Sequence, residues 1–375
     1  MQIITDENIA YAGEAFSTLG TVHQLPGRGI TRESLANADA LIIRSVTKVD
    51  AALLEGTSVR FVGTATIGTD HIDLPYLQSK GITFTDAKGC NADAVAEYVW
   101  TAIFHPALRT GKRLQDLTIG ICGVGNIGSR IRNTAKALGM GVVLCDPPLK
   151  DETGSDDYRP LHELRDADIV TFHTPYTTGG KYPTHHLADE AFFRSLKDGS
   201  IVINASRGEV ADNAALARVA AEKGLKLVLD VWEGEPSVHH PLLEQSLIAS
   251  PHIAGYTLEG KINGTSMVYK ALSKFAGVNG SWTAPHPPVE HSERVLQPGK
   301  DAWGAVGDLL CSIYEPLRDT EAMKQMMKMS DTEGRAHFDQ LRKNYPLRRE
   351  FFNYRMDAQG YGDDVREIVK KLGFH

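Results

Sequence analysis

The chain has 375 residues and a formal net charge of −7, and 42% of its residues are hydrophobic. This length predicts two or three domains, each large enough to bury a core. The mildly acidic balance argues against a nucleic-acid-binding protein. The opening residues MQIITDENIA lack the basic start of a signal peptide, and no apolar run is long enough to span a bilayer. We therefore expect a cytoplasmic protein without membrane or nucleic-acid partners.

Cysteines and histidines are not arranged as metal ligands. The cysteines are scattered, without C-x-x-C spacing, at Cys90, Cys122, Cys145 and Cys311. This pattern indicates neither a zinc site nor a disulfide framework, and we expect reduced, mostly buried thiols. Two pairs of adjacent histidines, at residues 185–186 and 239–240, would not converge on one metal, and we interpret both as solvated loop positions. No metal is predicted.

The N-terminal part of the chain alternates predicted strands with helical stretches. Apolar β-rich runs lie at residues 2–5, 40–47, 59–68 and 81–86, and such alternation is typical of a parallel α/β unit. We assign this unit to substrate binding. Two of its strand ends are suited to hold an anion, namely Arg44 with Ser45 and Thr66 with Gly68. Ordinary loop polarity is the open alternative for these residues.

The stretch from Leu117 to Pro148 combines a strand, a glycine turn, a helix and a second strand. Gly123, Gly125 and Gly128 fit G-x-G-x-x-G, whose glycines permit a tight turn, the approach of a pyrophosphate and close helix–strand packing. The N-terminus of the helix then faces the phosphates. Asp146 ends the second strand, where its carboxylate can bind an adenosine ribose and would repel a 2′-phosphate. The stretch therefore predicts NAD rather than NADP.

Four more β-rich runs follow, and each ends in polar residues, at 167–175, 199–208, 225–236 and 246–255. Ligands of parallel sheets bind outside the carboxyl ends of the strands. Hydride transfer to a nicotinamide leaves an alcohol proton that needs a base, and His252 titrates in a useful range. Arg207 presents a planar fork that matches a substrate carboxylate. Glu235 is suited to pair with His252 and orient it, with Glu233 as the competing carboxylate.

Two further polar residues end strands of this sheet. Asp230 ends LKLVLD, where we expect it to meet the nicotinamide amide or ribose, with a structural cap as the alternative. Thr174 ends ADIVTFHT and is a candidate cofactor contact, with a strand-end turn as its alternative.

Two long helical patterns, at residues 91–109 and 258–276, are predicted to connect the domains. Pro106 should kink or end the first helix. The second helix would return the chain to the first domain, which makes that domain discontinuous. Residues 277–299 are rich in Pro, His and Ser and indicate a linker. The remaining tail has helical spacing at residues 303–317 and is predicted to form a separate small domain.

With GVGNIG, Asp146, HTP, NASRGE, LDVWEGEP and PHIAG in this order, the chain resembles the D-isomer-specific 2-hydroxyacid dehydrogenases. The resemblance covers about residues 1–276. It implies an α/β fold in which a Rossmann NAD-binding domain (95–254) is inserted in a flavodoxin-like α/β substrate domain (1–94 and 255–284). A small α+β C-terminal dimerisation domain (285–375) follows. The implied activity is NAD-dependent oxidation of a small phosphorylated 2-hydroxy acid by a homodimer.

The resemblance also implies roles for individual residues. The implied catalytic residues are Arg207, Glu235 and His252, with His252 as the proton-transfer group. Substrate contacts are implied for Ser45, Thr66 and Tyr256, and Arg44 is added as a nearby cation. The expected cofactor contacts come from the glycine turn and the strand ends: Gly123, Gly125, Asn126, Ile127, Gly128, Asp146, Thr174, Ala205, Ser206, Arg207, Asp230 and Gly255. A tail arginine, Arg348 or Arg349, is expected to reach an active site and neutralise the substrate phosphate.

Two alternative functions stay open. One is a related dehydrogenase that acts on 3-phosphoglycerate or on an unphosphorylated hydroxy acid. The other is an NAD-sensing corepressor or scaffold without catalysis, since a fold alone does not determine function. The complete set of Arg207, Glu235 and His252 argues against a sensor, because a sensor needs no base.

Overall fold

The computed structural model describes residues 1–297 and 299–375. Contacts divide the described chain into two units. Unit 1 comprises Met1–Asn91 and Tyr256–Pro288, and unit 2 comprises Ala92–Gly255 and Val289–His375. The three domains and their boundaries, as drawn from the sequence, stay a prediction.

Within the described residues, unit 1 contains a five-stranded parallel sheet in the order β2-β1-β3-β4-β5. This is the flavodoxin-like strand order. The strands are β1 (Gln2–Asp6), β2 (Thr21–Leu25), β3 (Ala40–Ile43), β4 (Phe61–Thr64) and β5 (Thr83–Thr85). Four of them lie in the predicted β-rich runs. The sequence analysis missed β2, an edge strand whose polar residues TVHQL are largely exposed.

The longest helix of unit 1 is α10 (Leu258–Ala276), which has the predicted bounds. It begins where the Thr257 side chain accepts the Gly260 N–H, and it ends at Gly277, whose φ is +68°. It packs on β4 and on α1, and a Cβ at Gly63 of β4 would lie 2.5 Å from Val268 Cγ1. The other helices of this unit are short: α1 (Ala12–Phe16), α2 (Ala51–Leu54) and α3 (Leu74–Ser79).

In the described part of unit 2, six parallel strands form a sheet in the order β11-β10-β9-β8-β6-β7. The strand order reverses between β6 and β8, the position where open α/β sheets bind their ligands. The central strands β8 and β9 are buried throughout because helices cover both faces of the sheet. The strands are β6 (Thr118–Cys122), β7 (Gly141–Cys145), β8 (Ile169–Phe172), β9 (Ile201–Asn204), β10 (Lys226–Leu229) and β11 (Ser246–Ala249).

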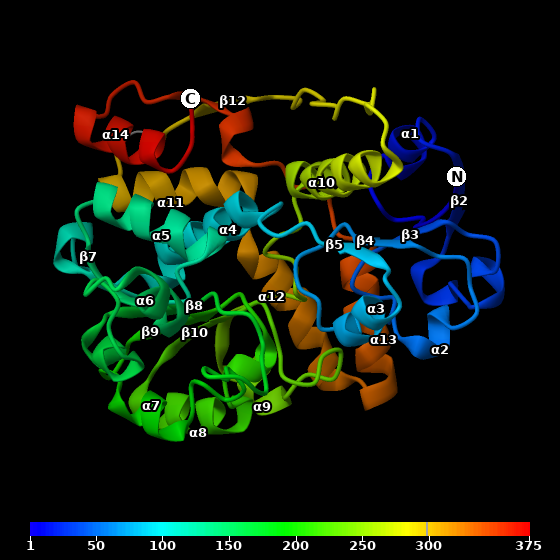
Figure 1. Cartoon of the computed structure of the whole chain (residues 1–375). Coiled ribbons are helices and arrows are strands. Elements are labelled where there is room, and N and C mark those ends of the chain that lie inside the picture. Colours follow the sequence, from blue (N-terminus) through cyan, green and yellow to red (C-terminus); the bar gives the residue numbers. More distant parts are fainter. Residues whose placement is uncertain (298) are drawn as a thin grey trace. The chain divides into compact units, whose positions relative to one another are not determined.

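Helix α4 (Ala92–Phe104) opens unit 2 and packs against α5 (Asn126–Ala137) and α11 (Ala302–Ile313), as Figure 1 shows. It ends just before Pro106, as predicted, and a short 3₁₀ turn, Pro106–Leu108, follows. Four more helices lie between the strands of this sheet in the chain: α6 (Pro147–Thr153), α7 (Glu190–Ser195), α8 (Asn213–Lys223) and α9 (His240–Gln245).

The C-terminal segment of unit 2 adds four helices and a strand within the described residues: α11, α12 (Pro316–Lys324), α13 (Asp331–Lys343), β13 (Arg355–Asp357) and α14 (Asp363–Lys371). The predicted linker contains β12 (Glu293–Val295), which pairs in parallel with β13. Helix α12 covers the edge of the sheet, where the Ala249 N–H of β11 donates to Thr320 Oγ1 at 3.0 Å. Three apolar side chains of this segment, Met323, Met326 and Phe338, belong to the same core as Phe172.

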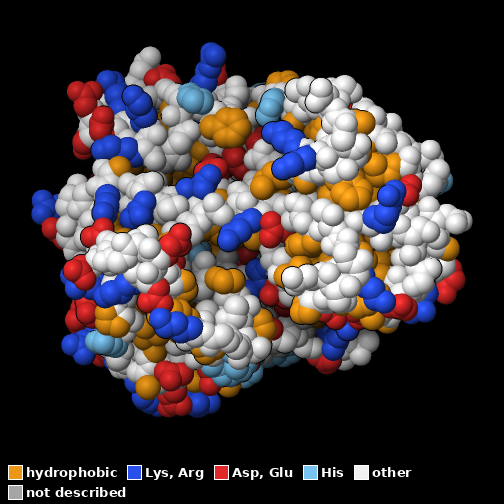
Figure 2. Space-filling view, in the orientation of Figure 1, with side chains coloured by type: hydrophobic (Ala, Val, Ile, Leu, Met, Phe, Trp, Pro, Cys, Tyr) orange, Lys and Arg blue, Asp and Glu red, His pale blue; other side chains and the backbone are white. Residues whose placement is uncertain are grey.

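Acidic and basic side chains are interspersed on the face that Figure 2 draws. Among the helices of residues 1–297 and 299–375, none combines the length and the apolar character that crossing a bilayer requires.

Candidate active site

The glycine turn after β6 has the geometry of a nucleotide-binding loop. Gly123 has a φ of +88°, and a Cβ there would lie 2.7 Å from the His173 carbonyl carbon. A Cβ at Gly128 would lie 2.0 Å from Gly123 O, so only glycine permits this contact between helix and turn. A Cβ at Gly125 would meet nothing within 4 Å. The open side at Gly125 fits the approach of a pyrophosphate to the exposed start of α5.

Asp146 and Thr174 also fit an NAD molecule. One Asp146 carboxylate oxygen accepts the Val124 N–H at 2.7 Å and the other accepts the Leu149 N–H at 3.0 Å. These bonds hold the carboxylate beside the glycine turn. Thr174 Oγ1 is buried without a hydrogen-bond partner among the described residues, and a cofactor group would satisfy it. Asn126 and Ile127 lie at the start of α5, where N–H groups are available to a phosphate.

Arg207 lies in the loop after β9, and Asn204 shapes that loop. The Asn204 side chain donates to Arg207 O at 2.9 Å and accepts from the N–H and the hydroxyl of Ser206. The Arg207 guanidinium donates to Ser206 O at 2.7 Å and is half-buried. The loop therefore holds the arginine at the carboxyl end of the sheet, next to the buried Ala205 and Ser206.

Asp230 holds the loop that carries His252. Its side chain is buried and accepts the Ser250 hydroxyl at 2.6 Å, the Ile253 N–H at 2.7 Å and the Ala254 N–H at 2.9 Å. The His252 N–H donates to Asp230 O at 2.7 Å. These bonds support the structural alternative for Asp230, and its contact with a cofactor stays a prediction, as does that of Gly255.

His252 pairs with Glu235, and not with Glu233. His252 Nδ1 lies 2.5 Å from Glu235 Oε1, and the Trp232 N–H donates to Glu235 Oε2 at 3.3 Å. Burial by itself raises the pKa of the Glu235 carboxyl. The charge and hydrogen bond of His252, the charge of Arg342 and the Trp232 N–H together outweigh burial, so this pKa lies below its ordinary value. The carboxylate therefore stays ionised beside the ring, and Nε2 of His252 is left to exchange a proton.

The other histidine at a strand end is His173, which has different surroundings. Burial lowers the pKa of His173 to about 3, and its Nε2 lies 2.8 Å from Thr171 Oγ1. The ring is therefore neutral at physiological pH and bonds to its own strand.

In unit 1, the predicted substrate residues are arranged around two strand ends. Arg44 donates two hydrogen bonds to the fully buried Asp6, at 3.0 and 3.3 Å. Because Asp6 neutralises it, Arg44 is a weaker phosphate ligand than the sequence suggests. Ser45 is exposed, and Thr66 Oγ1 lies 2.9 Å from Thr64 Oγ1.

Lys261 is a cation that the sequence analysis missed. Its Nζ lies 5.0 Å from the centre of the Tyr256 ring, and its side chain is exposed. It lies in the first turn of α10, five positions after Tyr256 in GYTLEGK. In the sequence, only this spacing, which crosses a loop and the start of a helix, indicates that Lys261 lies near Tyr256.

A tail arginine reaches the backbone two residues after His252 within the same chain. Arg348 is buried, its Nη2 donates to the carbonyl oxygens of Ala254 and Ala94, and its guanidinium lies 4.9 Å from the centre of the Tyr314 ring. Its Nη1 has no hydrogen-bond partner among the described residues. Contact of this arginine with a substrate phosphate stays a prediction.

One group of possible metal ligands occurs among the described residues, formed by His105, Cys311 and Glu315, whose ligand atoms lie within 4.8 Å of one another. However, His105 Nδ1 accepts the Ala107 N–H at 3.1 Å, so the ring proton is on Nε2, which faces Glu315 at 3.3 Å. Nε2 then has no lone pair for a metal. We assign no metal to this group.

Comparison with known proteins identifies the family. A model of the D-isomer specific 2-hydroxyacid dehydrogenase NAD binding domain matches residues 91–254. The erythronate-4-phosphate dehydrogenase of Yersinia enterocolitica is 47% identical over 381 residues, which cover 100% of this chain and 99% of that protein. The chain belongs to the D-isomer specific 2-hydroxyacid dehydrogenases. The corresponding Yersinia pestis protein is 48% identical over 380 residues, covering 100% of this chain and 99% of its own length. The family resemblance and the NAD-binding domain predicted from the sequence are thus confirmed.

Solved structures of similar fold support the α/β architecture. The D-lactate dehydrogenase of Aquifex aeolicus, complexed with NAD and lactic acid, has a TM-score of 0.63 at 25% identity and covers 74% of this chain and 96% of its own. The 3-phosphoglycerate dehydrogenase of Entamoeba histolytica has a TM-score of 0.64 at 23% identity, with 76% and 99% covered. Residues 287–373 match a domain of unknown function, DUF3410.

Proposed function

We propose that this chain oxidises 4-phospho-D-erythronate to (R)-3-hydroxy-2-oxo-4-phosphooxybutanoate with NAD, in the cytoplasm, as a step of pyridoxal 5′-phosphate synthesis. The observation that carries the proposal is the full-length identity of 47–48% to erythronate-4-phosphate dehydrogenases. The pair of His252 and Glu235 supports a catalytic protein over an NAD sensor, because a sensor needs no oriented base.

His252 is the proposed base. Nε2 takes the proton of the substrate C2 hydroxyl, and Glu235, held at 2.5 Å from Nδ1, orients the ring and stabilises its charge. Bound NAD supplies the acceptor for the hydride that leaves C2, so the products are a carbonyl, NADH and a proton on His252. General base catalysis of this kind contributes on the order of 10²–10⁴ in rate.

Arg207 is the proposed anion ligand of unit 2. Its guanidinium matches a carboxylate in two parallel hydrogen bonds and stabilises the oxygen as the carbonyl forms. The proposed cofactor ligands are the glycine turn, Asp146, Thr174 and the loop at Ala205 and Ser206. In unit 1, the proposed substrate ligands are Arg44, Ser45, Thr66 and Tyr256.

A homodimer is proposed as well. Its basis is the family resemblance, which implies a dimerisation domain in the C-terminal tail; a domain of unknown function matches residues 287–373 of this tail. The measurement is the molar mass in solution by light scattering, and a monomer at micromolar concentration would contradict it.

The test of the activity is NADH formation by the purified protein with NAD and 4-phospho-D-erythronate, beside 3-phosphoglycerate and D-lactate. A 2-oxo acid is added in parallel assays so that retained NADH can be reoxidised. We expect turnover of phosphoerythronate alone, and H252A should lower kcat by roughly 10²–10⁴. Turnover of another acid alone would contradict the substrate, and NADH binding without any turnover would favour the sensor.

A further inference from the structure

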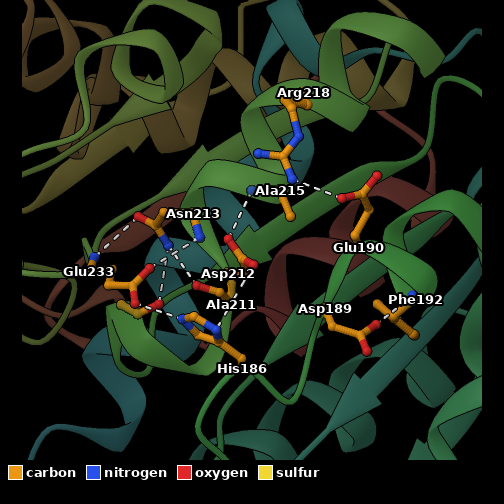
Figure 3. A network of polar contacts seen from close by, with 11 residues as sticks. His186, Asp189, Glu190, Phe192, Ala211, Asp212, Asn213, Ala215, Arg218 and Glu233 are labelled. Carbon is orange, nitrogen blue, oxygen red and sulfur yellow. Dashed lines mark hydrogen bonds and ion pairs between the residues drawn. The ribbon is translucent and has the colours of Figure 1, made fainter.

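Polar side chains join three loops at the carboxyl end of the unit 2 sheet (Figure 3). These side chains belong to His186, Glu233 and Asn213. His186 lies in the loop before α7, Asn213 is the first residue of α8, and Glu233 follows β10. His186 Nε2 lies 2.6 Å from Glu233 Oε1. His186 is therefore a half-buried structural partner, and not the solvated loop position that the sequence suggested.

Asn213 connects the Arg207 loop to the Glu235 loop. The Glu233 N–H donates to Asn213 Oδ1 at 3.1 Å, and the Asn213 N–H donates to Glu233 Oε2 at 3.3 Å. Asn213 Nδ2 donates in addition to Gly208 O at 3.2 Å and to Ala211 O at 2.8 Å. The buried asparagine thus fixes Glu233 against the segment that directly follows Arg207.

The two loops also contact each other through their backbones. A Cβ at Gly208 would lie 2.0 Å from the Trp232 carbonyl carbon and 2.2 Å from Glu233 N. Only Gly234, with a φ of +75°, separates Glu233 from Glu235. The position of Glu233 is therefore coupled through one residue to Glu235, whose carboxylate bonds His252.

His186 adopts an unfavourable backbone conformation at this place. Its φ is +48°, which is uncommon for a residue with a side chain and costs on the order of 1–3 kcal/mol. Its N–H donates to Glu209 O at 2.8 Å, and its ring stacks on His185 with centroids 4.1 Å apart. Nδ1 lies 3.9 Å from Asp212 Oδ2. The surrounding contacts therefore hold His186 in a strained conformation in which its ring bonds Glu233.

We propose that His186 is a positioning residue for catalysis: through Glu233 it fixes the loop that carries Glu235, and so sets the orientation of His252 relative to Arg207. This inference rests on the proposed function, because it assigns His252 and Arg207 their roles. The side chain of His186 bonds Glu233 and approaches Asp212, so its effect on Glu235, His252 and Arg207 is indirect. A displacement of a catalytic group by about 1 Å can lower the rate about 100-fold.

The experiment measures kcat, the KM for phosphoerythronate and the affinity for NADH in H186A, H186Q and E233Q. We expect H186A and E233Q to lower kcat by about tenfold or more, with NADH affinity changed less than about twofold. H186Q should recover most of the loss, because the glutamine amide can donate to Glu233 in place of Nε2. The double variant H186A/E233Q should lose no more than the worse single variant, since both substitutions act on the same His186–Glu233 interaction.

The matched control is R218A in helix α8, which also carries Asn213; it breaks an exposed ion pair of 2.8 Å with Glu190 (Figure 3). We expect wild-type kcat in R218A. Thermal unfolding of every variant shows whether it is folded at the assay temperature.

The outcomes separate this proposal from the proposed function. Wild-type protein that turns over no hydroxy acid would overturn both. An active wild type with unchanged kcat in H186A, additive losses in the double variant, or equal losses in H186A and H186Q would overturn the positioning role alone. A kcat loss that only follows the loss of folded protein would also overturn it.

Discussion

Two charged residues of the candidate site each have a definite side-chain partner. Glu235 bonds His252, and Arg44 bonds the buried Asp6. The sequence predicts Glu235 from its place after a strand, but periodicity alone cannot exclude Glu233. The two carboxylates are separated because Gly234 turns the chain with a φ of +75°. Glu233 is then directed to His186, a partner 47 residues away that no local pattern reveals.

Replacement of Glu235 by glutamine should change stability with pH in a defined direction. Folding lowers the pKa of this carboxyl from 4.5, so ionised Glu235 stabilises the folded state above that pH, and the contribution is lost as the pH falls through the folded-state pKa. We expect E235Q to lower the free energy of unfolding by about 1.5–3 kcal/mol at neutral pH. Urea denaturation should show this difference shrinking below pH 4.5. A difference that grew on acidification would contradict the assigned direction.

Lys261 should contribute to recognition of the substrate phosphate. It is exposed, and its Nζ lies 5.0 Å from the centre of the ring of Tyr256, a proposed substrate contact. We expect K261Q to raise the KM for 4-phospho-D-erythronate by about tenfold, since a charge-assisted hydrogen bond contributes about 1.5–3 kcal/mol. Steady-state kinetics on D-erythronate provide the comparison. Equal effects on both acids would refute a phosphate contact, and K270Q, about 13 Å along the same helix, is the control.

Strands and helices with buried, periodic faces are predictable from this sequence, and exposed or long-range elements are not. The central strands are continuous apolar runs, and Pro106 and Gly277 mark the helix ends because neither residue can continue a helix favourably. Strand β2 is polar and lies at an edge, so its sequence carries no alternating pattern. Strand β12 exists only through pairing with β13, about sixty residues later in the chain.

The glycine turn offers a test at the level of one strand–turn–helix element. A Cβ at Gly125 meets nothing within 4 Å, so G125A should fold normally but obstruct the pyrophosphate. We expect its NADH affinity to fall by about tenfold or more. A Cβ at Gly128 would lie 2.0 Å from Gly123 O, so G128A should lower the free energy of unfolding by about 1–3 kcal/mol through overpacking. NADH fluorescence titration and thermal unfolding of both variants measure the two effects. Loss of stability in G125A with intact affinity would contradict this division of roles.

Unit 2 is larger than its dinucleotide-binding motif indicates, because the C-terminal segment completes its core. The Pro-rich stretch at residues 277–299 interrupts the sequence pattern and so predicts a separate domain. Helical periodicity shows that a tail helix has an apolar face, but it cannot show which core that face joins. In the structure, Met323, Met326 and Phe338 pack into the core beneath the parallel sheet. Arg348 bonds the backbone two residues after His252.

Because the core is shared, the stability of the NAD-binding sheet should depend on Phe338, which lies more than eighty residues after the last strand of that sheet. Phe338 is 1% exposed, and F338A should cost about 3–5 kcal/mol by leaving a cavity. We expect the temperature at which bound NADH is released to fall, because the lost packing belongs to the same core as β8 and β10. The control F352A removes a ring that is 44% exposed and should leave the release temperature within about 2 °C. If F338A instead left NADH release unchanged and altered only the oligomeric state, the tail would be an appended module, and its helices would not stabilise the nucleotide-binding sheet.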